Sequence, residues 1–404
     1  MQNKIYQIYE NIVFSCLLLY GLTFLIDTKI NFITTAFFIN IFFLIYLKKS
    51  FPLQLYYTKE FKYYMYIIVY FLLMVFLSTI LSDGSLSIYK SRFINPLLGL
   101  FTIILFPMNF KRMFLLFLSF SVPLFINSLV VIYQFYLGNT GRPTGFCDSH
   151  YMFLAVTNSL ILPIVFTLSM YKSQLSKKIR IFLFLMILIG IPAIIFENTR
   201  IVWIELAIIF PLIILFSIKN KVKAVFLIVL LMLYSIFIFN ISPSSVNRAS
   251  TIPSTNYATQ SNYERILMWE SATKMFIDHP VVGVGLGNYY EEYMTNYRSP
   301  LSRETQGHPH NVLLAFLSET GLLGTSGYIL LFIYLYYYTI TNYIRNKDVF
   351  SLSFLFCLLA FTINSLTDTI FCQLGYRGNT SLFWILTGLY FILNKHLIVL
   401  KFKA

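Results

Sequence analysis

Charged side chains are scarce in this 404-residue chain. Asp, Glu, Lys and Arg together make up 11% of the residues, whereas hydrophobic types make up 58%. A water-soluble domain of this length needs far more polar surface than this composition provides. The shortage of charge therefore excludes an ordinary soluble protein and indicates that the lipid bilayer is the solvent for most of the chain.

Cysteine is also rare, and familiar metal or nucleotide motifs are missing. The four cysteines form no C-x-x-C pair and show no metal-ligand spacing. There is no Asp-x-Asp pair for a divalent metal and a nucleotide sugar, and the segment GVGLGN (283–288) does not fit the G-x-G-x-x-G spacing, so its glycines indicate a tight turn. We expect neither a bound metal nor another cofactor. For Cys147 and Cys372, both in loops predicted on the outer side, a disulfide and free thiols stay open as alternatives.

Acidic residues are fewer than basic ones, 16 against 30. The lysines and arginines gather in short loops between apolar runs, as in residues 172–180 and 219–223. This is the positive-inside pattern of membrane proteins, whereas a nucleic-acid-binding face would interleave basic and aromatic residues on a soluble domain. The distribution predicts that both termini lie in the cytoplasm and that nucleic acid is not a partner.

Apolar runs recur along nearly the whole chain, each of roughly 17–20 residues, which is the length of one bilayer crossing. We therefore predict an all-α integral membrane protein, a single polytopic domain over residues 1–404 with about 12 transmembrane helices. The tenth run is too long for one crossing, so we expect its start, through about Gly321, to lie partly outside the membrane. The predicted spans are residues 10–26, 30–47, 64–82, 93–107, 113–137, 151–170, 181–199, 201–218, 224–241, 312–343, 349–367 and 381–394.

One loop, residues 242–311, is long, polar and aromatic, and the charge pattern places it outside, between spans nine and ten. Its first part is rich in Ser, Thr, Pro and Asn and is expected to be irregular. From Tyr263 onward, apolar residues fall near helical spacing. They predict an amphipathic helix that lies on the membrane surface or packs on the bundle, and that ends before the segment DHP at 278–280.

Three arginines on the predicted outer side are candidates for binding an anion. A guanidinium is permanently charged and matches the geometry of phosphate oxygens. Arg200 lies between two apolar runs in FENTRIVWIEL; a snorkelling side chain or a local pair with Glu197 is the alternative. Arg265 lies on the amphipathic helix, where a solvated face or pairing with a neighbouring glutamate is the alternative. Arg142, in TGRPTGFCDSH, is a weaker candidate, since a loop shaped by Gly and Pro explains it equally well.

The segment GHPHN (307–311) places two histidines just before an apolar helix. Pro309 restricts His308 to extended geometry, so we expect the two rings to point in different directions. Asn311 is the predicted helix cap. The helix dipole disfavours a protonated His310, and a neutral imidazole suits a general base; an ordinary loop histidine is the alternative. No third ligand lies at helical spacing, so the pair is not a metal motif.

Further along the same helix, Glu319 either is a buried polar partner or lines a wet cavity. The cytoplasmic loops are too short to build a catalytic domain. We therefore expect any reaction to take place at the outer face.

Several of these motifs resemble a known family. DHPVVGVGLGNYYEEY (278–293), followed by HPHNVLLAFLSETGLLG (308–324), resembles the signature region of the O-antigen ligase and polymerase superfamily. The segments RPTGFCDSHYMFLA, ENTRIVWIEL and NYERILMWESATKMFIDHP resemble its motifs upstream. The resemblance covers most of residues 140–385 and is most specific around 265–325.

The resemblance implies an inner-membrane glycosyltransferase of C-type architecture in lipopolysaccharide biosynthesis. Such an enzyme transfers a glycan from undecaprenyl pyrophosphate to a lipid A-core sugar hydroxyl at the periplasmic face, with inversion and without metal. Carried over by motif, His310 is the general base, and Arg200 and Arg265 hold the pyrophosphate. Asp368, in SLTDTIF, corresponds to a polar position near the end of the penultimate span. The extra His308 leaves open which ring is catalytic; His310 is preferred because it directly precedes Asn311.

Three other functions compete with a ligase. A polymerase would extend the lipid-linked chain itself, but members of that branch commonly have two sizeable basic outer loops, whereas this chain has one. A protein O-oligosaccharyltransferase is disfavoured because no large C-terminal region is present. A transporter of lipid-linked glycans would need charges along a path through the membrane, and here they gather at one face.

Overall fold

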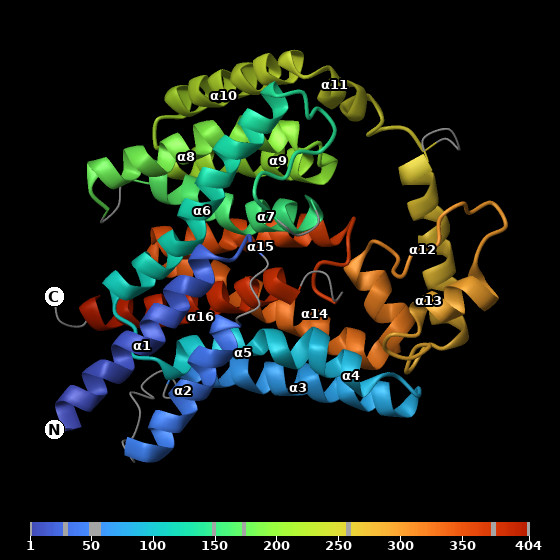
Figure 1. Cartoon of the computed structure of the whole chain (residues 1–404), viewed down its shortest axis with the longest axis horizontal. Helices are drawn as coiled ribbons and strands as arrows, with labels where there is room; N and C mark the ends of the chain where they lie inside the picture. The colour runs from blue at the N-terminus through green and yellow to red at the C-terminus, as the bar shows by residue number, and fades with distance from the viewer. Residues whose placement is uncertain are drawn as a thin grey trace.

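The protein is a bundle of helices (Figure 1). It is described by a computed structural model over residues 2–26, 31–47, 58–147, 151–171, 175–255, 260–372 and 377–401. These residues contain no β-strand. Nine helical segments among them are long and apolar enough to cross a membrane, and Phe32–Phe43 and Val349–Ser365 are shorter apolar helices. The prediction of an all-α integral membrane protein is confirmed, while the count of 12 crossings stays a prediction.

Each of the predicted spans coincides with a helix or a continuous helical run. Their bounds are α1 (Gln2–Leu22), α2 (Phe32–Leu47), α3 (Lys59–Leu81), the run of α4 (Leu86–Tyr89), η2 (Lys90–Ile94) and α5 (Asn95–Leu105), α6 (Phe110–Tyr136), α7 (Tyr151–Met170), α8 (Lys177–Phe196), α9 (Arg200–Ser217), α10 (Lys221–Ile241), α14 (Val312–Asn346), α15 (Val349–Ser365) and α16 (Arg377–Lys401). The 242–311 segment adds α11 (Pro243–Ser250), α12 (Gln260–Asp278), α13 (Tyr289–Glu292) and η3 (Tyr293–Tyr297).

Helix α7 is the most enclosed of the long apolar helices that could cross a membrane, with almost all of its length buried between α8, α9 and α15. Helix α10 is the opposite case: it is largely exposed and touches the bundle through α8 and α9. In Figure 1 it lies along one edge and continues through α11 toward α12. The first turns of α1 lie at the opposite end of the bundle from α12 and α13.

The long tenth segment is broken where the sequence predicted that it leaves a simple crossing. Gly321 has φ 55° and ψ −157° inside α14. The break frees backbone groups of α14, and these form hydrogen bonds with the segment that contains the glycine-rich loop. Leu322 N–H donates to Pro280 O at 2.9 Å, and Val284 N–H donates to Ser318 O at 2.8 Å. Buried backbone groups need such partners, so the loop and the break in α14 require each other.

The glycine-rich loop is a tight turn, as predicted, since Gly283, Gly285 and Gly287 all have positive φ. A Cβ on Gly283 would lie 2.4 Å from the backbone carbon of Glu319. No other residue type could bring the two backbones so close. The glycines therefore serve packing against α14.

The predicted amphipathic helix is α12; it ends at Asp278, one residue later than predicted. Its residues Met268, Ala272 and Met275 are buried against Tyr289 and Tyr293, and the helix packs on α14. Of the two alternatives, packing on the bundle is therefore the one that the structure shows.

Candidate active site

The site begins at the cap of α14. Asn311 accepts a hydrogen bond from Leu314 N–H at 3.0 Å, which confirms it as the N-cap residue. Its side-chain amide also donates to Leu366 O at 3.1 Å, just beyond the end of α15. This second bond joins the start of α14 to the turn that carries Asp368.

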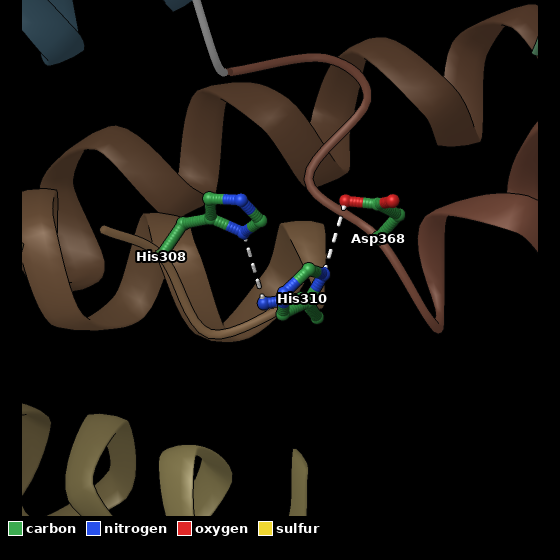
Figure 2. A group of neighbouring side chains, drawn as sticks. All are labelled: His308, His310 and Asp368. Atoms are coloured by element: carbon green, nitrogen blue, oxygen red, sulfur yellow. Dashed lines mark hydrogen bonds and ion pairs between the residues drawn. The ribbon is translucent and has the colours of Figure 1, made fainter. Parts of the chain in front are cut away.

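His310 has a left-handed backbone conformation, with φ 51°. Such a conformation is costly for a residue other than glycine and is concentrated at functional sites. It turns the chain back, so that the rings of His308 and His310 lie 4.1 Å apart with an angle of 61° between their planes (Figure 2). The expectation that the rings point in different directions was wrong, because it allowed for the proline but not for a left-handed residue after it.

Asp368 faces the ring of His310 (Figure 2). His310 Nδ1 lies 3.4 Å from Asp368 Oδ1, and the carboxylate is buried. The separation is longer than an ordinary hydrogen bond. A carboxylate on Nδ1 favours the tautomer with its proton there, which leaves Nε2 as the basic nitrogen.

His308 uses its Nδ1 as an acceptor. It receives the backbone N–H of His310 at 3.3 Å and lies 2.9 Å from Thr369 Oγ1. Since a backbone amide can only donate, Nδ1 must carry a lone pair. Burial first, and then the charge of His310, lower the pKa of His308 to about 3. This ring is therefore neutral at physiological pH. Its hydrogen bonds stabilise the turn, and it does not take up a proton there.

Asp368 is an anion under the same conditions. Burial by itself raises the pKa of this carboxyl, but the hydrogen bond and charge of His310, the charge of His308 and the backbone N–H of Thr369 outweigh it and bring the pKa to about 2. Thr369 N–H donates to Asp368 Oδ1 at 2.8 Å. The carboxylate is thus held in place beside His310.

His310 also lines a cavity of about 290 Å³ beside α9, α11 and α12. The predicted residues Arg142, Arg200 and Arg265 line it too, so the structure brings them and His310 together. A fourth arginine, Arg248 on α11, completes the lining. The sequence reasoning missed it, because the serine-rich segment around it was expected to be irregular; the available signal was a further basic residue in the same outer loop as Arg265.

The four guanidinium groups differ in their contacts. Arg200 donates to Thr251 O and Oγ1 at 3.2 and 3.0 Å, to Ser261 Oγ at 3.1 Å and to Asn262 Oδ1 at 2.9 Å. It thereby joins the start of α9 to the C-cap of α11 and the first turn of α12. The suggested local pair with Glu197 is not what the structure shows, since Glu197 accepts bonds from Asn158 on α7.

Arg265 has no ion pair within the part of the chain that the structure describes. The neighbouring Glu264 instead accepts from Ser302 Oγ at 2.7 Å and Arg303 N–H at 2.8 Å. Arg142 stacks over the ring of Tyr151 at 3.9 Å; residues 148–150 of its motif lie outside the described residues. Burial and then the charge of Arg142 lower the pKa of Arg248. Such mutual repulsion would be relieved by a bound anion.

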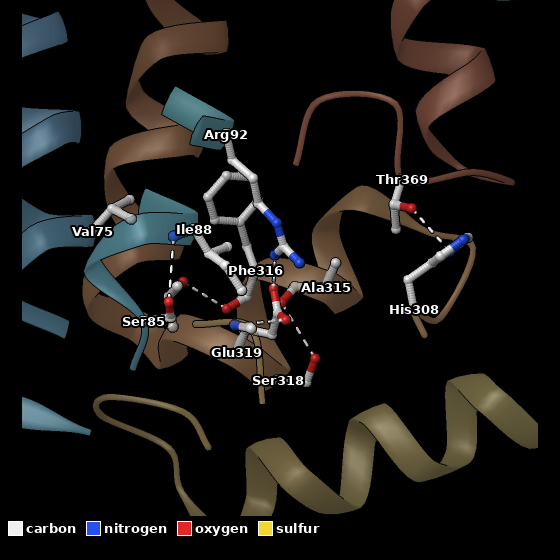
Figure 3. A network of polar contacts seen from close by, with 12 residues as sticks. Val75, Ser85, Ile88, Arg92, His308, Ala315, Phe316, Ser318, Glu319 and Thr369 are labelled. Carbon is white, nitrogen blue, oxygen red and sulfur yellow. Dashed lines mark hydrogen bonds and ion pairs between the residues drawn. The ribbon is translucent and has the colours of Figure 1, made fainter. Parts of the chain in front are cut away.

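Glu319 is not part of this cavity lining. It accepts from Arg92 Nη1 at 2.5 Å and from Gly287 N–H at 3.0 Å (Figure 3). Of its two predicted roles, the structure therefore shows a buried polar partner. Arg92, on η2, was not singled out from the sequence, because nothing local connects it with α14.

His308, His310 and Asp368 offer ligand atoms within 4.8 Å of one another, so the group could hold a metal ion by proximity. The sequence argument against a metal considered only nearby ligands and overlooked Asp368. Two features of the structure nevertheless disfavour a cation. His308 Nδ1 is already occupied as an acceptor, and the adjoining cavity carries four arginines, which repel a further positive charge.

All four cysteines are thiols, so the disulfide suggested as one alternative for Cys147 and Cys372 is not formed in the structure. The site as a whole joins the imidazole of His310 and the carboxylate of Asp368 to a cluster of guanidinium groups. Fold and site together define a multi-pass membrane protein suited to proton transfer beside a bound anion.

Residues 183–329 match the family described as O-antigen ligase. The match runs from α8 into α14 and includes Arg200, Arg248, Arg265 and His310. It supports the O-antigen ligase superfamily that the motifs indicated, without separating the ligase branch from the polymerase branch. A comparison with curated proteins finds no match to the chain.

Proposed function

We propose that this protein is an O-antigen ligase that transfers a glycan from undecaprenyl pyrophosphate to a sugar hydroxyl of lipid A-core at the periplasmic face. The family match supports a glycosyltransferase of this general type. The observation that carries the proposal is the convergence of His310 and four arginines on one cavity, with Asp368 behind the imidazole.

The reaction follows from the tautomer of His310. Its Nε2 accepts the proton of the acceptor hydroxyl while Asp368 stabilises the positive charge that develops on the ring. The hydroxyl oxygen forms a bond to the anomeric carbon of the donor sugar, and the bond from that carbon to the pyrophosphate oxygen breaks. Undecaprenyl pyrophosphate leaves with the electron pair. A single displacement of this kind inverts the anomeric centre.

The arginines supply the second half of the catalysis. Charge accumulates on the departing pyrophosphate, and fixed guanidinium groups stabilise it without a metal ion. Arg265 and Arg248 are suited to contact the phosphates directly. Arg200 is hydrogen-bonded to the C-cap of α11 and the first turn of α12, so part of its proposed role is to keep those two arginines at the cavity.

The test is transfer in liposomes that contain the purified full-length protein, a purified lipid-linked donor and lipid A-core. We expect His310→Ala to lower kcat by a factor of about 10² to 10⁴, the range of general-base catalysis, whereas His308→Asn loses less. A His310→Ala protein that transfers at the full rate would exclude the base role.

The closest alternative is a polymerase that adds repeat units to the lipid-linked chain. It uses the same donor and the same site, so lipopolysaccharide from a deletion strain separates the two. Core that lacks all polymer identifies a ligase, and core that carries a single repeat unit identifies a polymerase. A transporter would leave the donor chemically unchanged in the liposome assay.

A further inference from the structure

The cavity that is lined by His310 and the four arginines is also lined by a carboxylate and an amide. These belong to Glu304 and Gln306, in the segment that leads into α14. Gln306 Nε2 donates to Glu304 Oε2 at 3.0 Å. Within the part of the chain that the structure describes, Glu304 forms no ion pair, although arginines line the same cavity. The Glu304–Gln306 pair therefore presents polar groups to a molecule bound in the cavity.

The backbone of this segment is held by Glu264 on α12, whose side chain is buried. Glu264 accepts from Ser302 Oγ at 2.7 Å and from the backbone N–H groups of Arg303 and Glu304 at 2.8 and 3.4 Å. Hydrogen bonds to a carboxylate are stronger than those between neutral groups. Because Arg265 follows Glu264 on the same helix, α12 positions both an arginine of the cavity and the segment that carries the pair.

A pyrophosphate is a poor ligand for the Glu304–Gln306 pair. Its ionised phosphates carry negative charge and offer only acceptor oxygens, so a carboxylate repels them. A sugar hydroxyl is the opposite case, because it can donate to the carboxylate and accept from the amide. The cavity thus combines a cationic surface that suits an anion with a second surface that suits an uncharged, hydroxylated ring.

We propose that Glu304 and Gln306 bind hydroxyl groups of the acceptor sugar and so select the hydroxyl that reaches His310. This rests on the proposed function and adds the residues that recognise the acceptor. The pair and His310 belong to one continuous segment, residues 304–310, so a sugar held by the pair is presented to the imidazole. Arg200 and Arg248 line the cavity from α9 and α11 instead, and the pyrophosphate of the donor lies beside them.

Binding of each substrate to the full-length protein in nanodiscs separates these two surfaces. Glu304→Gln and Gln306→Leu should each raise the Kd of lipid A-core about tenfold, because each loses a hydrogen bond to the sugar. Glu304→Gln also removes a negative charge from a cavity lined by arginines, so the Kd of the lipid-linked donor should not rise. Glu291→Gln, the same change at an exposed position of α13, is the control and should leave both constants as in the wild type.

Two results overturn the proposal. An equal rise in the Kd of donor and acceptor would show that the pair only maintains the fold of the segment. A lower donor Kd with an unchanged lipid A-core Kd would show that Glu304 only competes with the phosphates for the arginines.

A second measurement changes the ligand and keeps the wild-type protein. The terminal sugar of lipid A-core is prepared with one hydroxyl at a time replaced by hydrogen. At least one replacement, other than that of the transferred hydroxyl, should raise the Kd about tenfold in the wild type and cause no further loss in Glu304→Gln, as expected for two groups in contact. Equal binding of all analogues to the wild type, or equal losses in both proteins, contradicts the contact.

The outcomes also distinguish this site from the proposed function. Selective loss of lipid A-core binding in Glu304→Gln, without any transfer by the wild type in liposomes, removes the glycosyltransferase assignment and keeps the binding site. Transfer by the wild type, with acceptor binding unchanged in both variants, removes the site and keeps the enzyme.

Discussion

His310 Nδ1 and Asp368 Oδ1 lie 3.4 Å apart, although one residue precedes α14 and the other follows α15. The contact is maintained by bonds on both sides: Asn311 reaches Leu366 O, and Thr369 Oγ1 contacts His308 Nδ1. The imidazole of His310 and the carboxylate of Asp368 are therefore positioned by the ends of α14 and α15 together.

Asp368→Asn should lower kcat with little change in the KM of either substrate. The amide of asparagine can donate to Nδ1 and would then favour the tautomer whose Nε2 carries the proton, which is the wrong form for a base. Loss of a partner that orients a histidine commonly costs about 10- to 100-fold. Steady-state kinetics in liposomes measure the effect, and Asp348→Asn, at the cap on the opposite end of α15, is the control. An unchanged kcat would show that the pair is structural.

Arg265→Ala and Arg200→Ala should differ in their effect on stability. Arg265 has no ion pair with described residues, so its loss should raise the KM of the donor about tenfold and leave the unfolding midpoint near that of the wild type. Arg200 donates several hydrogen bonds to the C-cap of α11 and the first turn of α12, so Arg200→Ala should weaken donor use and also reduce the free energy of unfolding by about 2 kcal/mol.

Thermal unfolding and donor titration on the same preparations separate the two effects. Equal destabilisation by both substitutions would contradict the positioning role of Arg200. A rise in the acceptor KM as large as in the donor KM for Arg265→Ala would contradict pyrophosphate binding by Arg265.

Acid should destabilise the protein partly through His308. Burial and the charge of His310 lower the pKa of His308 to about 3 in the folded protein, whereas an unfolded histidine titrates near pH ~6.5. Between these values the unfolded chain binds the proton and the folded chain does not, so stability falls as the pH falls. From pH 7 to pH 5 the loss is about 2 kcal/mol.

His308→Gln removes this titration, so the difference between its unfolding midpoints at the two pH values should be smaller than in the wild type. His279→Gln is the matched control, because His279 is exposed at the end of α12. Identical acid sensitivity in the His308→Gln and wild-type proteins would show that this ring is not the cause.

Gly283→Ala should destabilise the break in α14. The new Cβ would meet the backbone of Glu319 at 2.4 Å, and the residue has φ 71°, so strain and overpacking should together cost about 2 kcal/mol or more. Gly307→Ala is the control, since a Cβ there meets nothing within 4 Å. Unfolding in denaturant compares the two; a Gly283→Ala protein as stable as Gly307→Ala would contradict the tight packing of the loop on α14.

The helical segments could be predicted because their signals are local. Apolar runs of bilayer length indicate the spans, Asn311 before Val312 predicts the cap, and the periodicity from Tyr263 predicts α12. The bounds moved by up to eight residues, as at the start of α1, since caps and end turns rather than hydropathy decide where a helix begins and ends. The sequence also indicated that the tenth apolar run is not one simple crossing, because the run is too long for a single span. The structure breaks the helix at Gly321, close to the predicted point.

The composition and the spacing of residues by themselves determined that the lipid bilayer is the solvent and that the fold is all-α. They also determined where the helical segments lie and gave a short set of polar residues as candidates for the site. Only the tertiary structure decided that Asp368 faces His310, that Arg248 joins the cavity, that Arg200 bonds to α11 and α12 and that Arg92 pairs with Glu319. Each of these contacts depends on how helices distant in the sequence pack against one another. Hydrophobic burial specifies that helices pack but not which polar side chains then meet, so those pairings cannot be derived from any local pattern.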